Sequence, residues 1–175
     1  MKIIRILFVL AVVIIGAGLG VIFSGTYNVA ATEPHAPLAA WILDTTMTYS
    51  VHHQAADIKV PDLSKPDMIE TGYRHYDEMC VECHGAPGKE PEELAKGLNP
   101  PPPNLIKTVP EWTPAELFWI VKHGVRMTGM PAWGPTHSDD KLWDIVAFLE
   151  KLPTLTPAQY QAMGAKAALM PDHDQ

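Results

Sequence analysis

The chain has 175 residues and a formal net charge of −7, and its only charged residues before Glu33 are the basic Lys2 and Arg5. The remainder is therefore more acidic than the whole chain. Such a surface argues against a nucleic-acid partner and suits a protein with a basic docking patch, although a merely solvated acidic surface is an equally good interpretation. Its 17 prolines and 12 glycines predict short helices joined by irregular loops. No segment alternates apolar and polar residues convincingly, so we predict an all-α fold.

Residues 1–24 are predicted to anchor the chain in a membrane. Residues 6–23 form an apolar run without a charge, about the lower length for a bilayer span and longer than the usual signal-peptide core of about 7–15 residues. Lys2 and Arg5 on its N-terminal flank place that end in the cytoplasm and the rest of the chain across the membrane. The alternative is a signal cleaved near residues 29–31, which would release a soluble exported protein.

Three further regions follow this segment. Residues 25–65 are predicted to be a connector. Within it, residues 38–54 form a possible amphipathic helix, which would lie on the membrane, on a partner subunit or on the following domain. Residues 66–152 are predicted to be the compact domain. Residues 153–175 form a tail whose role the sequence leaves open, with a short helix after Pro157.

The compact domain should contain three main helices, at residues 67–80, 114–123 and from 136 or 138 to 152. Gly72 in the first costs about 1 kcal/mol relative to alanine, so a close helix contact is expected there. Thr113 and Glu116 can form a capping box at the start of the second, and Gly124 is expected to end it in the left-handed conformation. Four prolines at 100–103 exclude a helix and predict an extended segment.

The two cysteines of the chain lie in Cys80-Val81-Glu82-Cys83-His84. Two thiols with two residues between them, on a tight helical turn, can bond the two vinyl groups of one haem. The adjacent histidine then reaches one axial position of the iron. We predict one covalently attached haem c, with Cys80 and Cys83 as attachment points and His84 as the proximal ligand.

Other interpretations of the cysteine pair are weaker. A thioredoxin-like redox pair requires a βαβ context, and a structural zinc site requires four ligands, usually with a second Cys or His pair. A plain disulfide would not require His84.

Met130, in Thr128-Gly129-Met130-Pro131, is the predicted second axial ligand. It lies in a rigid loop, follows His84 by 46 residues, and its thioether favours ferrous iron. Met127 and the remaining histidines are the rivals, and simple packing is the alternative role of Met130. His123 suits a helix C-terminus and is also a candidate hydrogen-bonding group near the haem. The other six histidines are expected to be exposed polar residues: His35, His52, His53, His75, His137 and His173.

Taken together, the haem motif, Gly72 and Tyr76 on the preceding helix, Met130 in a Gly-Met-Pro loop and Trp143 on the last helix resemble a class I c-type cytochrome. The resemblance covers residues 66–152. With the N-terminal segment, the chain is similar to the membrane-anchored monohaem forms of bacterial respiratory chains. This implies that the haem domain lies in the periplasm, tethered to the inner membrane.

The resemblance also implies roles for individual residues. Gly72 and Tyr76 would cross the last helix near Trp143. A carbonyl of Pro102 or Pro103 would accept the Nδ1 proton of His84 and fix its orientation. Trp133 would pack near the haem, although an ordinary core position suits it equally.

The expected function is therefore outer-sphere electron transfer between membrane-bound respiratory partners by a protein that is not itself an enzyme. A fixed subunit of a membrane oxidoreductase complex is the alternative. A haem sensor or peroxidase, which needs an open sixth iron position, is a third possibility. No nucleic-acid partner and no small-molecule substrate is expected.

Overall fold

The computed structural model describes residues 1–168, where all named elements are helices and Ala86 and Lys89 form an isolated bridge. The all-α prediction is confirmed. In chain order the elements are α1 Lys2–Ser24, α2 Pro37–Ala55, α3 Pro66–Met79, α4 Val81–His84, α5 Glu93–Lys96, α6 Leu105–Thr108, the 3-10 turn η1 Val109–Glu111, α7 Pro114–His123, α8 Asp139–Lys151, the 3-10 turn η2 Leu152–Thr154 and α9 Pro157–Ala167.

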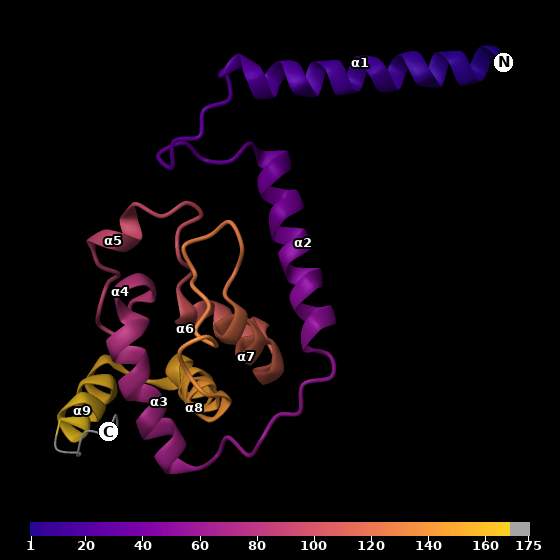
Figure 1. Ribbon diagram of the computed structural model, residues 1–175. Helices are drawn as coiled ribbons and strands as arrows, with labels where there is room; N and C mark the ends of the chain where they lie inside the picture. Colours follow the sequence, from indigo (N-terminus) through magenta and orange to yellow (C-terminus); the bar gives the residue numbers. More distant parts are fainter. Residues whose placement is uncertain (169–175) are drawn as a thin grey trace. The chain divides into compact units, whose positions relative to one another are not determined.

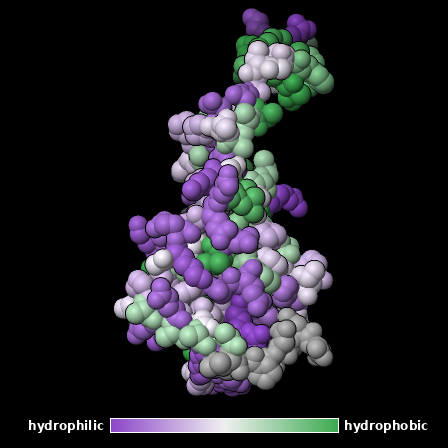
Figure 2. Space-filling model, turned by 90° about the vertical axis from the view of Figure 1, so that its left-hand side faces the viewer, coloured by the Kyte–Doolittle hydropathy of each residue, from purple (hydrophilic) through white to green (hydrophobic). Residues whose placement is uncertain are grey.

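The chain divides into two compact units, Met1–Glu33 and the part from Pro34 onward. The first unit contains α1, which among the described residues is the one helix long and apolar enough to cross a membrane. None of its residues is buried, and hydrophobic colour dominates its surface in Figure 2. An exposed apolar helix of this length matches the thickness of a bilayer core.

The second unit is organised by the crossing of α3 and α8 (Figure 1). The two helices meet at Gly72, where a Cβ atom would lie 1.9 Å from the carbonyl oxygen of Asp144 and 2.9 Å from Cβ of Phe148. The Tyr76 ring packs on Phe148 with its centroid 5.1 Å away. The expected close contact at Gly72 is confirmed, and glycine is there because any side chain would force the helices apart.

Helix α7 packs on α8 and begins as the sequence predicts. Its N-terminus is a capping box in which Thr113 Oγ1 accepts from Glu116 N and Thr113 N donates to Glu116 Oε2. The expected left-handed cap at Gly124 is wrong: its φ of 64° is positive, but its ψ of −173° is extended. The chain therefore leaves the helix abruptly and enters the loop that carries Met130.

Helix α2 packs against α7 with its C-terminal half. Val51 and Ala55 are buried. His52 pairs through Nδ1 with the carboxylate of Glu116, and its ring lies 5.6 Å from that of Trp112. Burial alone would raise the pKa of Glu116, but its bonds to Thr113 and His52 outweigh this and lower it. Of the three positions considered for this helix, the structure shows packing on the domain for its C-terminal half, and His52 is not simply a solvated residue.

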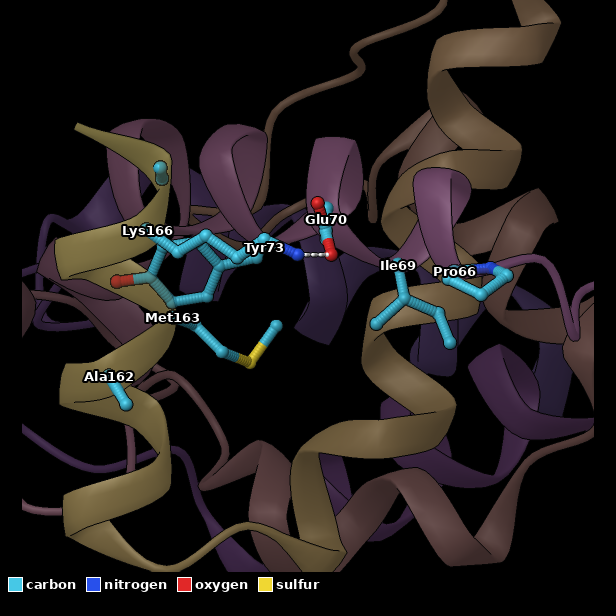
Figure 3. A pocket seen from close by; sticks show the side chains of 8 residues that line it. Pro66, Ile69, Glu70, Tyr73, Ala162, Met163 and Lys166 are labelled. Atoms are coloured by element: carbon cyan, nitrogen blue, oxygen red, sulfur yellow. Dashed lines mark hydrogen bonds and ion pairs between the residues drawn. The ribbon is translucent and has the colours of Figure 1, made fainter. Parts of the chain in front are cut away.

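The tail helix α9 packs on α3 (Figure 1). The buried Tyr160 donates its hydroxyl to Asp77 Oδ1 at 2.7 Å, and Lys89 Nζ donates to the same oxygen at 2.6 Å. Beside this contact, a pocket of about 400 Å³ opens between α3 and α9, with the ion pair of Lys166 and Glu70 at its edge (Figure 3). The part of the tail that the structure describes is thus packed on the domain.

Candidate haem-binding site

The two cysteines and His84 are brought together by the junction of α3 and α4. Cys80 caps α3, its N–H donating to Tyr76 O at 2.9 Å. Its carbonyl then accepts from the N–H groups of Cys83 at 3.1 Å and of His84 at 2.9 Å. The three side chains therefore start from one tight turn, and both thiols are free of any disulfide.

A hydrogen bond from α3 also stabilises this turn. The Tyr76 hydroxyl, fully buried, donates to the carbonyl oxygen of Gly85 at 2.6 Å. Tyr76 packs against α8 through Phe148. The residue that follows His84 is thus tied to the α3–α8 crossing, a connection that spacing in the sequence alone does not reveal.

The imidazole of His84 is oriented by the proline segment. Its Nδ1 lies 2.9 Å from the carbonyl oxygen of Pro103, one of the two carbonyls considered from the sequence. Because a carbonyl only accepts, Nδ1 carries the proton and Nε2 has a free lone pair for a metal. Burial lowers the pKa of His84, and the bond to Pro103 opposes only part of that effect. The ring is therefore held neutral, as an iron ligand must be.

The environment of Cys80 disfavours redox chemistry by a thiolate. Burial raises the pKa of its thiol to about 12, and Cys83 adds to the shift. Redox-active cysteine pairs require the opposite, a lowered pKa. A zinc site is also unsupported, because within residues 1–168 no group of three or more Cys, His, Asp or Glu side chains is placed to hold a metal ion. The donor set fits a haem that is bound covalently and through one imidazole.

Met130 lies in the loop between α7 and α8, which is closed by local bonds. Val125 N donates to Met130 O at 3.2 Å, and Met130 N donates to Thr128 Oγ1 at 3.1 Å. The same hydroxyl donates to Val125 O at 2.7 Å. Thr128 therefore holds the backbone of Met130 in place, a role that a threonine two residues before a candidate ligand could have suggested.

The Met130 loop and the proline segment meet at Leu98. A Cβ on Gly129 would lie 2.7 Å from Leu98 Cδ1, so the loop carrying the second candidate ligand packs on the segment that leads to Pro103. The six candidate side chains share partial burial, which suits a flat group laid against the protein surface: Cys80, Cys83, His84, Pro102, Met130 and Trp133. Pro103 itself is exposed and contributes through its carbonyl.

The rival residues are placed differently. Met127 lies in the loop rather than on the helix, is 70% exposed and has a φ of 62°. His123 is exposed at the end of α7, with its ring 5.0 Å from that of Trp119.

The expectation of an exposed His75 is wrong. It is buried on the inner side of α3, with its ring 6.0 Å from that of His137, because α3 turns this position toward the loop before α8. His173 lies outside the described residues.

Comparison with known proteins supports the same interpretation. Residues 67–149 match the family model described as cytochrome c oxidase, cbb3-type, subunit III. A curated relative, the cbb3-type cytochrome c oxidase subunit FixP of Rhizobium meliloti (strain 1021), is 30% identical over 96 residues. The match covers 51% of this chain and 29% of that relative. The haem motif, the oriented histidine and this match together make residues 67–149 similar to a c-type cytochrome domain.

Proposed function

We propose that this protein is a membrane-anchored monohaem cytochrome c that transfers single electrons between respiratory partners. The observation that carries the proposal is the pairing of two free thiols on one turn with an imidazole whose Nδ1 is satisfied by Pro103. When bound, the haem supplies one-electron exchange at its iron. The protein supplies attachment, axial ligands and a fixed environment.

Each candidate residue has a defined task in this proposal. Cys80 and Cys83 would form the thioether bonds, and His84 would bind the iron through Nε2. Met130 would be the second iron ligand through its sulfur, which would leave no position for a substrate. Thr128 keeps the Met130 backbone in place. Trp133, which is partly buried, would pack near the haem.

The anchor confines the domain to the surface of a membrane. We infer a periplasmic haem domain in a bacterial cell, because Lys2 and Arg5 near the start of α1 favour a cytoplasmic N-terminus by the positive-inside rule. Diffusion is then restricted to the membrane plane, which raises the rate of encounter with membrane-bound electron donors and acceptors.

A fixed subunit of an oxidase complex is the second candidate, favoured by the match to a cbb3-type subunit model. The free carrier and the fixed subunit predict different products when membranes are solubilised with a mild detergent. A stable stoichiometric assembly that contains this chain supports the subunit, and a lone monomer supports the carrier.

The visible spectrum of the purified full-length protein tests the haem and its ligands. We expect a reduced haem c spectrum and, in the oxidised protein, the weak band of sulfur-to-iron ligation. Met130→Ala should abolish that band while covalent haem remains, and the matched variant Met127→Ala should keep it. Loss of the band in Met127→Ala alone would show that the wrong methionine was chosen. Binding of carbon monoxide by the reduced wild type at neutral pH would instead support a sensor or peroxidase.

A further inference from the structure

Helix α2 carries an exposed apolar stripe formed by Leu38, Trp41, Ile42 and Tyr49. Their exposed fractions are 67%, 63%, 47% and 71%. With a rotation of roughly 100° per residue, the four side chains fall within about 100° of the helix circumference. The stripe lies before the matched cytochrome region, which begins at residue 67, so the electron-transfer site does not account for it.

The stripe lies beside the buried face that holds α2 on the domain, and its line continues toward the C-terminal end of the helix to His52, which pairs with Glu116. Val51 and Ala55, which are buried against the domain, point roughly 100–140° away from the centre of the stripe. Asp44, the one acidic residue of α2, falls on the same side as these buried residues, and the helix contains no lysine or arginine. One side of the helix is therefore occupied, while the adjacent apolar side is uncharged.

The connection to α1 indicates what covers the stripe. Twelve residues, 25–36, separate the end of α1 from the start of α2, and a chain of that length reaches at most about 43 Å. The stripe can therefore reach the surface of the membrane that α1 is proposed to span. Trp41 and Tyr49 combine an apolar ring with one polar group, the combination enriched where hydrocarbon meets headgroups.

We propose that this stripe lies in the headgroup region of the membrane, as a second, interfacial contact of the chain. Because α2 carries no lysine or arginine, the contact depends on apolar burial and does not require anionic lipid. The pairing of His52 with Glu116 then links a membrane-bound helix to α7, which leads directly into the Met130 loop. The haem domain is held in one orientation at the membrane instead of swinging on a flexible tether.

The test measures the depth of a spin label in the full-length holoprotein, reconstituted alone into phosphatidylcholine vesicles. Labels are placed at Ile42→Cys on the stripe, at Ala40→Cys as the matched control and at Leu10→Cys in α1. Ala40 is also exposed, and two residues of rotation turn it almost opposite to Ile42. Cys80 and Cys83 do not react with the label when they are bonded to haem.

We expect the label at Ile42 to collide more with oxygen than with a polar nickel chelate, and the label at Ala40 to show the reverse. Equal, water-like accessibility at both positions would overturn the proposal. Protection of Ile42 in native membranes but not in pure vesicles would also overturn it and indicate a protein groove. Dipolar broadening between Ile42 labels would indicate a second copy instead. Since the inference depends on the anchor, Leu10 distinguishes the two failures: a water-exposed Leu10 label shows that α1 does not span the bilayer.

Discussion

The two candidate iron ligands lie on segments that are stabilised in different ways. His84 ends a helical turn, and its ring is oriented by Pro103, 19 residues away in sequence. The next residue is tied to the buried Tyr76. Met130 lies in a loop whose backbone bonds connect it to Thr128 and Val125, both within five residues.

This difference predicts different consequences of mutation. Segments held by short-range bonds at the surface open at a lower free energy than segments tied to the core. Substitutions in the helices that support His84 should therefore reduce the stability of the whole domain. Changes in the Met130 loop should alter iron ligation while the covalently attached haem remains. The four predictions below run from the largest expected effect to the smallest.

Gly72→Ala should have the largest effect, because it disrupts the crossing of α3 and α8 that supports His84. The added Cβ would lie 1.9 Å from a backbone oxygen of α8, so no rotamer change can relieve the contact. We expect a cost above about 4 kcal/mol, at the upper end of single-residue effects, and little or no folded holoprotein. The yield of haem-bound protein and its thermal unfolding check this. Gly97→Ala is the control, since its nearest atom would be 3.7 Å away; similar losses in both variants would contradict the prediction.

Gly124→Ala should instead affect the loop that carries Met130. Its φ of 64° with a ψ of −173° is a conformation that essentially only glycine adopts, and the Cβ would lie 2.7 Å from Met130 O. We expect a cost of about 2–3 kcal/mol and a displaced loop. The oxidised spectrum should lose the sulfur-to-iron band, and the protein mass should still include haem. Met127→Gly, which relieves a positive φ, should keep the band. Retention of the band in Gly124→Ala would show that this loop does not position the ligand.

Much of the structure around His84 could be predicted from the sequence, because it depends on contacts between residues that are close in the chain. The spacing of Cys80, Cys83 and His84 requires one helical turn, and Thr113 with Glu116 specifies a helix start by residue type alone. Gly72 indicated a close helix contact because glycine is otherwise costly in a helix.

Contacts between distant segments could not be predicted in the same way. The choice of Pro103 over Pro102 depends on how the proline segment lies against His84. Burial of His75 depends on the packing of α3 against the loop before α8, and the pairing of His52 with Glu116 joins residues 64 positions apart. Polar side chains give no periodic signal of these contacts, because each is satisfied by a single specific partner.

Tyr76→Phe should weaken the support of the turn that carries His84 without abolishing it. The substitution leaves the ring packed on Phe148 but removes the hydroxyl that donates to Gly85 O, so a buried carbonyl loses its partner. We expect a loss of about 1–2 kcal/mol in the free energy of unfolding, measured by denaturant titration of the holoprotein. The sulfur-to-iron band should be unchanged. Tyr49→Phe, at an exposed position, should have no measurable effect, and an equal loss there would contradict this explanation.

Asp144→Asn should stabilise the α3–α8 crossing in a pH-dependent way. Burial raises the pKa of this carboxyl to about 6, with repulsion from Asp67 and Asp140 adding to the shift, against 3.8 for an ordinary aspartate. Below about pH 4 the group is protonated in both the folded and the unfolded chain, so it carries no penalty. As the pH rises through 6, the folded state must accept a charge that the unfolded chain bears freely, and stability is lost.

The full shift corresponds to about 3 kcal/mol, which solvent screening at this partly exposed position reduces to about 1 kcal/mol. Unfolding of wild-type and Asp144→Asn holoprotein should therefore differ at pH 7.5 and coincide at pH 4. The exposed Asp57→Asn should show no such pH-dependent gain. Because Asp144 acts on the support of His84 and not on the Met130 loop, the sulfur-to-iron band should be the same in both proteins at pH 7.5. A change in that band would show that the support of His84 and the Met130 loop are coupled through α8.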